Sequence, residues 1–127
     1  MKRFENKVVA ITGGGSGMGK LSCEMFAAEG AKVCVVDINE KTAQATADGI
    51  IAAGGTAKAY AFDITDATAM EAFFKDVVDT FGRIDVYFTI AGISPVGTAT
   101  TTSVEDFRKV VALDMESVFL GCKFSIP

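Results

Sequence analysis

Short apolar runs alternate along this chain with longer segments of helical periodicity, and no other feature constrains its fold as strongly. The order is strand, helix, strand, helix, strand, helix, strand, loop, helix. Strands are expected at residues 7–12, 32–37, 56–62 and 86–90, and helices at residues 16–29, 39–53, 66–81 and 104–124. Such alternation predicts a parallel sheet with helices on both faces and right-handed crossovers. The expected fold is therefore a doubly wound α/β unit over residues 1–127.

Helical periodicity identifies the side chains that are expected to face the sheet. They are Leu21, Met25 and Ala28 in the first helix, Ala43, Ala47, Ile50 and Ile51 in the second, and Met70, Phe73, Phe74, Val77, Val78 and Phe81 in the third. Ser103 has the side chain of an N-cap and is expected to begin the last helix. In that helix Phe107, Val111 and Val118 form an apolar stripe that also contains Asp114.

Composition excludes several classes of function. The net charge is −4 and no basic block occurs, which argues against a nucleic-acid partner. No apolar run approaches the roughly 20 residues of a membrane span, so no membrane partner is expected. The chain has no histidine, which removes Ser-His-Asp hydrolysis and histidine-containing zinc sites, and no metal site is expected. Its three scattered cysteines predict buried free thiols in a reducing compartment, the cytoplasm.

A glycine-rich loop, TGGGSGMGK at residues 12–20, follows the first strand directly. Glycines there permit close approach of the backbone to a ligand, and the next helix N-terminus favours a phosphate group. The common dinucleotide fingerprint G-x-G-x-x-G is not met by any three of these glycines. The P-loop pattern fits from Gly14 to Gly19-Lys20 but has Leu21 where a hydroxyl should bind Mg²⁺. A P-loop-like nucleotide-binding protein therefore stays open as an alternative.

The pattern T-G-x-x-x-G-x-G is met by Thr12, Gly13, Gly17 and Gly19, and it resembles the short-chain dehydrogenase/reductase family. The resemblance covers the whole chain. FDIT at residues 62–65, FGRIDVYFTIAG at 81–92 and FRKVVALDMESVFLGCK at 107–123 are similar to later family motifs, in the family's order. It implies a Rossmann-like sheet of which four strands are present. It also implies a cofactor site formed by Thr12, Gly13, Gly15, Ser16, Gly17, Met18, Gly19, Asp37, Ile38, Asp63, Ile64, Ala91 and Gly92.

Asp37 favours NAD as the cofactor over NADP. It lies 18 residues beyond Gly19, at the end of the second strand, where the family places its ribose-binding acid. A carboxylate there accepts hydrogen bonds from the ribose hydroxyls and repels a 2′-phosphate. The positions where a phosphate-binding cation would be expected hold Ser16 and Ile38. Asp37 could also cap the helix that begins near Asn39, which would not exclude the ribose role.

Two positions depart from the family pattern. The family's Asn-Asn-Ala-Gly appears as TIAG at residues 89–92, so the amides are replaced while Ala91 and Gly92 remain. The family's asparagine on the long helix appears as Asp114, the one candidate catalytic residue in this chain. Asp114 is expected either to point inward with the apolar stripe or to lie partly solvated at the cofactor cleft.

The catalytic groups of the family are not found in this sequence. The resemblance implies a serine and a Tyr-x-x-x-Lys motif beyond the long helix. Tyr60 is followed four residues later by Ile64, and Tyr87 by Ala91, so neither tyrosine begins this motif. We therefore expect that residues 1–127 are the cofactor-binding part of a longer chain and are inactive alone.

The same resemblance implies hydride transfer between NAD(H) and an alcohol/ketone substrate in the full-length protein. It further implies a homo-oligomer formed through the long helix, residues 104–124. The fourth strand is expected to be a bare edge of the sheet. A non-catalytic NAD-binding or interaction module remains the alternative if the chain is complete.

Overall fold

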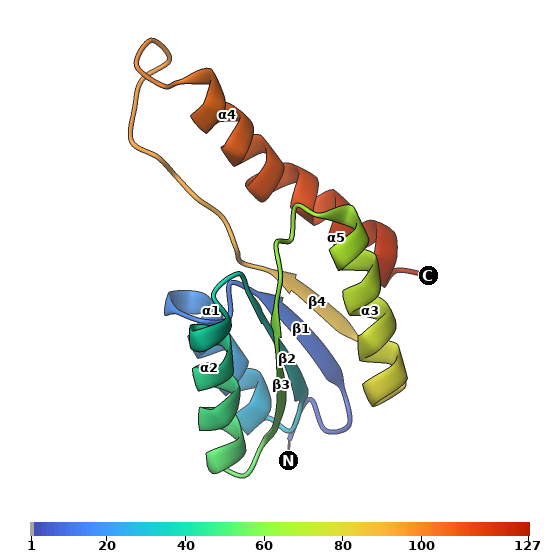
Figure 1. Cartoon of the computed structure of the whole chain (residues 1–127). Helices are drawn as coiled ribbons and strands as arrows, with labels where there is room; N and C mark the ends of the chain where they lie inside the picture. Colours follow the sequence, from blue (N-terminus) through green and yellow to red (C-terminus); the bar gives the residue numbers. More distant parts are fainter. Residues whose placement is uncertain (1) are drawn as a thin grey trace.

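A computed structural model describes residues 2–127 and contains one four-stranded sheet (Figure 1). The strands are β1 (Val8–Thr12), β2 (Lys32–Asp37), β3 (Thr56–Ala61) and β4 (Val86–Thr89). They pair in parallel in the order β3-β2-β1-β4. The first three helices are α1 (Gly17–Ala28), α2 (Glu40–Ala52) and α3 (Ala67–Phe81). The predicted doubly wound α/β fold with four parallel strands is confirmed.

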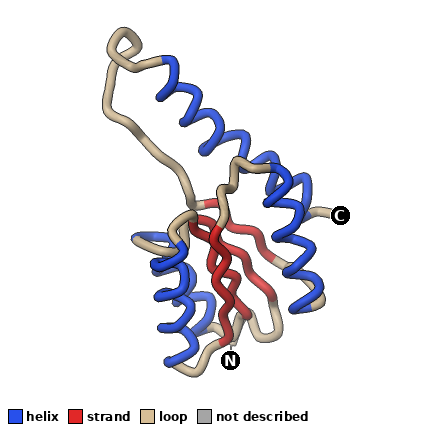
Figure 2. The backbone as a smooth tube through the Cα atoms, in the orientation of Figure 1, coloured by secondary structure: helices blue, strands red, loops and turns tan. Residues whose placement is uncertain are grey.

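Helices cover both faces of the sheet (Figure 2). Each face has its own apolar core. Successive residues of β1 point to opposite faces, as in any strand. Val9 and Ile11 pack with residues of α1 and α2, whereas Val8 and Ala10 pack with residues of α3 and of the last helix. All five residues of β1 are buried, which is typical of a central strand in a parallel sheet.

The direction of strand addition reverses next to β1. The chain adds β2 and then β3 on one side of β1, and α3 then returns it to the other side, where it forms β4. Such a reversal opens a crevice at the carboxyl ends of the strands, which is the usual ligand site of doubly wound sheets. The outer strands of the described sheet are β3 and β4, as expected for β4.

The inward face of α1 differs from the one predicted. Leu21 and Met25 are 56% and 59% exposed, and the buried residues are Gly19, Cys23 and Ala27. A Cβ atom at Gly19 would overlap the carbonyl oxygen of Gly13, so this helix packs its smallest side chains against the sheet. The prediction was wrong because it placed the large apolar residues of α1 against the sheet, whereas the small ones lie there. The stripes predicted for α2 and α3 were also too wide, because Ile51 and Val78 are exposed.

The long helix predicted at residues 104–124 is interrupted. It consists of α4 (Val104–Val110), the π-helical segment η1 (Val111–Glu116) and α5 (Ser117–Ser125). Ser103 caps α4 as predicted, because its Oγ accepts a hydrogen bond from the Asp106 amide at 3.0 Å. α4 extends away from the sheet and contains no buried residue, so the predicted inward position of Phe107 was wrong (Figure 1). α5 packs against β4 and α3.

The three cysteines differ in environment. Cys23 and Cys34 are buried, and burial raises the pKa of both thiols to about 12. Cys122 is exposed, so the prediction of three buried thiols was wrong for this residue. Within residues 2–127, no helix has the length and apolar character needed to span a bilayer.

Candidate functional site

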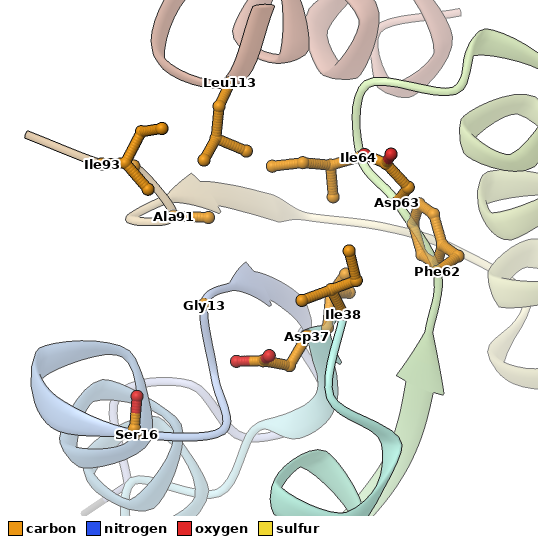
Figure 3. A pocket seen from close by; sticks show the side chains of 12 residues that line it. Gly13, Ser16, Asp37, Ile38, Phe62, Asp63, Ile64, Ala91, Ile93 and Leu113 are labelled. Atoms are coloured by element: carbon orange, nitrogen blue, oxygen red, sulfur yellow. The ribbon is translucent and has the colours of Figure 1, made fainter. Parts of the chain in front are cut away.

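A cavity of about 300 Å³ lies at the carboxyl ends of the strands, where the direction of strand addition reverses (Figure 3). Its side chains come from the ends of β1, β2 and β4, from the segment after β3, and from η1. The lining residues are Gly13, Ser16, Val36, Asp37, Ile38, Phe62, Asp63, Ile64, Ala91, Gly92, Ile93 and Leu113. Elements far apart in the sequence therefore meet around one space.

Most of the residues predicted from the glycine loop and the later motifs meet at this cavity. Those that line it are Gly13, Ser16, Asp37, Ile38, Asp63, Ile64, Ala91 and Gly92. Those that do not line it are Thr12, Gly15, Gly17, Met18, Gly19 and Asp114. The lining residues that sequence reasoning missed are Val36, Phe62, Ile93 and Leu113. Each of these is an apolar neighbour of a predicted residue, and adjacency was the only signal that could have found it.

The glycine loop brings β1 close to the end of β4 and leaves open space at the start of α1. Gly13 has φ +69°, and a Cβ there would lie 3.2 Å from the backbone of Ala91. Gly17 has φ +52°, yet a Cβ there would have no atom within 4 Å. Ser16 makes no side-chain hydrogen bond to cap α1. The N-terminus of α1 is therefore accessible to an anion, beside a loop with little steric bulk.

Asp37 presents a carboxylate of fixed orientation at the rim of the cavity. Its Oδ2 accepts a hydrogen bond from the Gly15 amide at 2.9 Å, and its Oδ1 accepts one from the Asn39 amide at 3.0 Å. The N-cap of α2 is Asn39, whose side chain accepts from the Thr42 amide, so Asp37 is not the capping residue. Its carboxylate oxygens lie within reach of a ligand at the loop.

The side chain of Asp63 is held in place by hydrogen bonds from Thr65, two residues further along the chain. Its Oδ1 accepts hydrogen bonds from the amide and the hydroxyl of Thr65, at 2.9 and 2.7 Å. The neighbouring Ile64 is buried and forms part of the cavity wall. A carboxylate and an apolar wall thus lie side by side on the segment that follows β3 (Figure 3).

Thr12 supports the cavity from beneath and does not line it. Its side chain is almost completely buried, and its Oγ1 accepts hydrogen bonds from the amides of Ile90 and Ala91, at 3.1 and 3.2 Å. Ile90 packs into the core beneath α1, in a position where family members carry an amide side chain. The hydroxyl of Thr12 therefore fixes the backbone that leads from β4 into the cavity wall.

Asp114 lies in η1 and is exposed, so the inward orientation considered for it is wrong. Its Oδ1 accepts a hydrogen bond from the Ile93 amide at 2.9 Å, and a Cβ at Gly92 would lie 3.2 Å from the same oxygen. The partly solvated alternative fits the structure better. Asp114 contacts the loop that forms one wall of the cavity, and its neighbour Leu113 lines that cavity directly.

The two tyrosines lie outside the residues that line the cavity. The Tyr60 hydroxyl donates to Oδ2 of Asp76 at 2.7 Å, and burial together with this bond raises the pKa of Tyr60. Burial raises the pKa of Tyr87 to about 12, and its ring packs against α5 and Phe74. Neither phenol is placed or tuned to exchange a proton with a ligand in the cavity near neutral pH.

The model of the short chain dehydrogenase family matches residues 7–127. The chain belongs to this family. Among curated family members, an uncharacterized oxidoreductase of Thermotoga maritima is 42% identical over 97% of this chain and 48% of its own length. A meso-2,3-butanediol dehydrogenase of Serratia marcescens is 37% identical over 98% of this chain and 49% of its own length. The chain spans about half the length of the curated relatives it matches.

Solved structures of short-chain dehydrogenases have the same fold. A hydroxysteroid dehydrogenase from Escherichia coli matches 97% of this chain and 52% of its own, with a TM-score of 0.92 and 32% identity. A short chain dehydrogenase from Mycobacterium avium matches 98% of this chain and 46% of its own, with a TM-score of 0.93 and 34% identity. The family uses nicotinamide cofactors, and the resemblance inferred from the glycine loop is confirmed.

Proposed function

We propose that residues 1–127 form the NAD-binding part of a single short-chain dehydrogenase domain. We further propose that the protein is an oxidoreductase that transfers hydride between NAD(H) and an alcohol/ketone substrate. One observation carries the assignment of the cofactor: the Asp37 carboxylate and the glycine loop meet at the same cavity. Membership of the family supports the reaction class.

The residues present fit a dinucleotide. The pyrophosphate would lie at the N-terminus of α1, where the open space beside Gly17 admits a ligand. Asp37 would accept hydrogen bonds from the adenosine ribose hydroxyls. Asp63 would contact the adenine amine, and Ile38 and Ile64 would form apolar walls for the base. The other residues proposed to contact the cofactor are Gly13, Gly15, Ser16, Met18, Gly19, Ala91 and Gly92. Thr12, the remaining member of the predicted cofactor site, would act indirectly, by holding the backbone of Ala91.

The charge of the cavity supports NAD over NADP. The charged residues among those that line it are Asp37 and Asp63, and both are acidic. A 2′-phosphate on the adenosine ribose would face the Asp37 carboxylate without a cation to offset the repulsion. Leu21 has no side-chain oxygen that could bind the Mg²⁺ of a P-loop protein, and it does not line the cavity.

We expect the chain of 127 residues to bind the cofactor without turning over a substrate. The bound nicotinamide would supply the site of hydride transfer, and a protein group must exchange the hydroxyl proton. Tyr60 and Tyr87 lie away from the cavity, and neither begins a Tyr-x-x-x-Lys motif. Asp114 accepts a hydrogen bond from the Ile93 amide. This bond favours a role in supporting the cavity wall over a role in proton transfer.

Substitution of Gly17 tests the proposed cofactor site. Gly17→Val should abolish binding of NADH in calorimetry, because the added side chain would fill the space proposed for the pyrophosphate. Gly54→Val is the matched control, since Gly54 also has positive φ (+87°) and a Cβ added there would have no atom within 4 Å, but it lies far from the cavity. The control should bind NADH normally. Normal binding by Gly17→Val would show that the loop is only a structural turn.

A further inference from the structure

The Asp37 carboxylate accepts hydrogen bonds from two backbone amides that belong to different elements. The Gly15 amide comes from the glycine loop, and the Asn39 amide comes from the turn before α2. Each carboxylate oxygen uses one lone pair on an amide and keeps acceptor capacity for a ligand. The residues that supply these amides therefore set the direction in which the free lone pairs of Asp37 point.

Asn39 and Thr42 fix the peptide that holds Oδ1 of Asp37. The Asn39 side chain accepts a hydrogen bond from the Thr42 amide at 3.2 Å, which is an N-cap of α2. The Thr42 hydroxyl donates to the Asn39 carbonyl oxygen, also at 3.2 Å. Both side chains therefore restrain the backbone at Asn39, whose amide points at the carboxylate.

Thr42 also restrains the other amide, because it leaves no room for a side chain at position 15. A Cβ at Gly15 would collide with the Thr42 hydroxyl oxygen and would lie 2.8 Å from Oδ2 of Asp37. Glycine is therefore required here by packing, although its φ is not positive. The Thr42 hydroxyl and the Asp37 carboxylate therefore both limit the space beside Gly15, whose amide donates to Oδ2 of Asp37.

We propose that Asn39 and Thr42 are positioning residues for Asp37, and that they help to determine the preference for NAD over NADP. Gly15, Asp37, Asn39 and Thr42 form one unit, which we call the carboxylate clamp. The inference rests on the proposed function, since it assigns the preference to the orientation of the carboxylate as well as to its charge. Since each oxygen of Asp37 already accepts a hydrogen bond from one amide, two ribose hydroxyls can bind the carboxylate only when both oxygens face them.

Amide hydrogen exchange in the free chain tests the clamp without any cofactor. Asn39→Ala should speed exchange of the Gly15 amide roughly fivefold. This factor corresponds to the stabilisation that one N-cap typically provides. Gly15 lies in another element, so a purely local cap would leave its amide unchanged. Asn39→Ser keeps a capping side chain and should preserve protection. Ser103→Ala removes the same kind of cap from α4 and should not affect Gly15.

Cofactor binding supplies the second readout. Asn39→Ala should lower the ratio of NADH to NADPH affinity roughly fivefold, whereas Asn39→Ser and Ser103→Ala should leave it unchanged. An unchanged ratio and unchanged Gly15 exchange in Asn39→Ala would overturn the clamp. If the unsubstituted chain bound neither cofactor but showed the expected exchange pattern, the proposed function would fail while the clamp held.

A double-substitution cycle tests the contact between Gly15 and Thr42, and it does not depend on Asn39→Ala folding. Gly15→Ala should weaken NADH binding at least tenfold when Thr42 is present, because the new Cβ collides with the Thr42 hydroxyl and also lies 2.8 Å from Oδ2 of Asp37, an overlap that remains in both backgrounds. The same substitution should weaken binding several-fold less in a Thr42→Ala background. Equal losses in both backgrounds would show that Thr42 does not restrain position 15, and would overturn its assignment.

Discussion

At the scale of single residues, Thr12 supports the site without lining the cavity. The sequence places it at the start of the glycine motif, which suggests contact with the cofactor. In the structure its hydroxyl accepts two hydrogen bonds from the backbone that follows β4. A valine has nearly the same shape but cannot accept them. Two partly buried amides would then lose their partners, and each loss costs about 1–3 kcal/mol.

Thr12→Val should therefore lower the free energy of unfolding by about 2 kcal/mol or more. Thr12→Ser keeps the acceptor and loses one methyl group, so it should cost about 1 kcal/mol or less. Urea unfolding followed by circular dichroism measures both. Equal stability of the two variants would show that the hydroxyl does not hold the end of β4.

Which site residues the sequence reveals depends on their chemistry. Asp37, Asp63 and the glycines are recognisable because they stand in sequence motifs at positions that few residue types can occupy. Ile93 and Leu113 are ordinary apolar residues whose place in the cavity wall depends on η1 and on the loop before α4. No local pattern encodes that placement. The carboxylate clamp could not be predicted from the sequence for the same reason, because it depends on the close approach of Gly15 to Thr42 in the folded chain.

At the scale of elements, α5 is fitted to β4 through a single small residue. Gly121 is buried, and a Cβ there would overlap the ring of Tyr87. Strands and helices were predictable from apolar periodicity, because a parallel sheet requires continuous buried runs. The division of the last helix was not predictable. No local sequence pattern marks the π-helical segment η1, in which Asp114 accepts a hydrogen bond from the Ile93 amide of the distant loop after β4.

Gly121→Ala should lower the free energy of unfolding by about 1–3 kcal/mol, because α5 must move away from Tyr87. Gly49→Ala is the matched control within α2, where a Cβ would meet no atom within 4 Å. The control should be neutral or stabilising, by up to about 1 kcal/mol, since alanine favours helix over glycine. A stable Gly121→Ala variant would contradict the close packing of α5 on β4.

At the scale of the whole molecule, large apolar side chains remain exposed along the last helical segment. Val104, Phe107, Met115, Phe119 and Ile126 are each more than half exposed. Several large exposed apolar side chains on one segment are typical of protein–protein interfaces. We propose that a second copy of the chain covers these side chains, because the family resemblance implies a homo-oligomer formed through residues 104–124. The sequence predicted neither the exposure of Phe107, which was expected to face inward, nor the break at η1.

Sedimentation measures that association directly. The chain should sediment as a dimer, and Phe119→Glu should convert it to a monomer by placing a charge in the apolar surface. Met25→Glu alters a comparably exposed side chain on α1 and should leave the dimer intact. A monomer without any substitution, or dissociation caused equally by both variants, would contradict an interface on α4 and α5.

Asp37 is proposed to decide which cofactor the molecule binds, and calorimetry with NADH and NADPH is the decisive experiment. We predict that the chain binds NADH at least tenfold more tightly than NADPH, and that Asp37→Ala removes this difference. The substitution should weaken NADH binding and relieve the repulsion of the 2′-phosphate. Equal affinity for both cofactors in the unsubstituted chain, or a preference for NADH that survives Asp37→Ala, would contradict the role of this carboxylate.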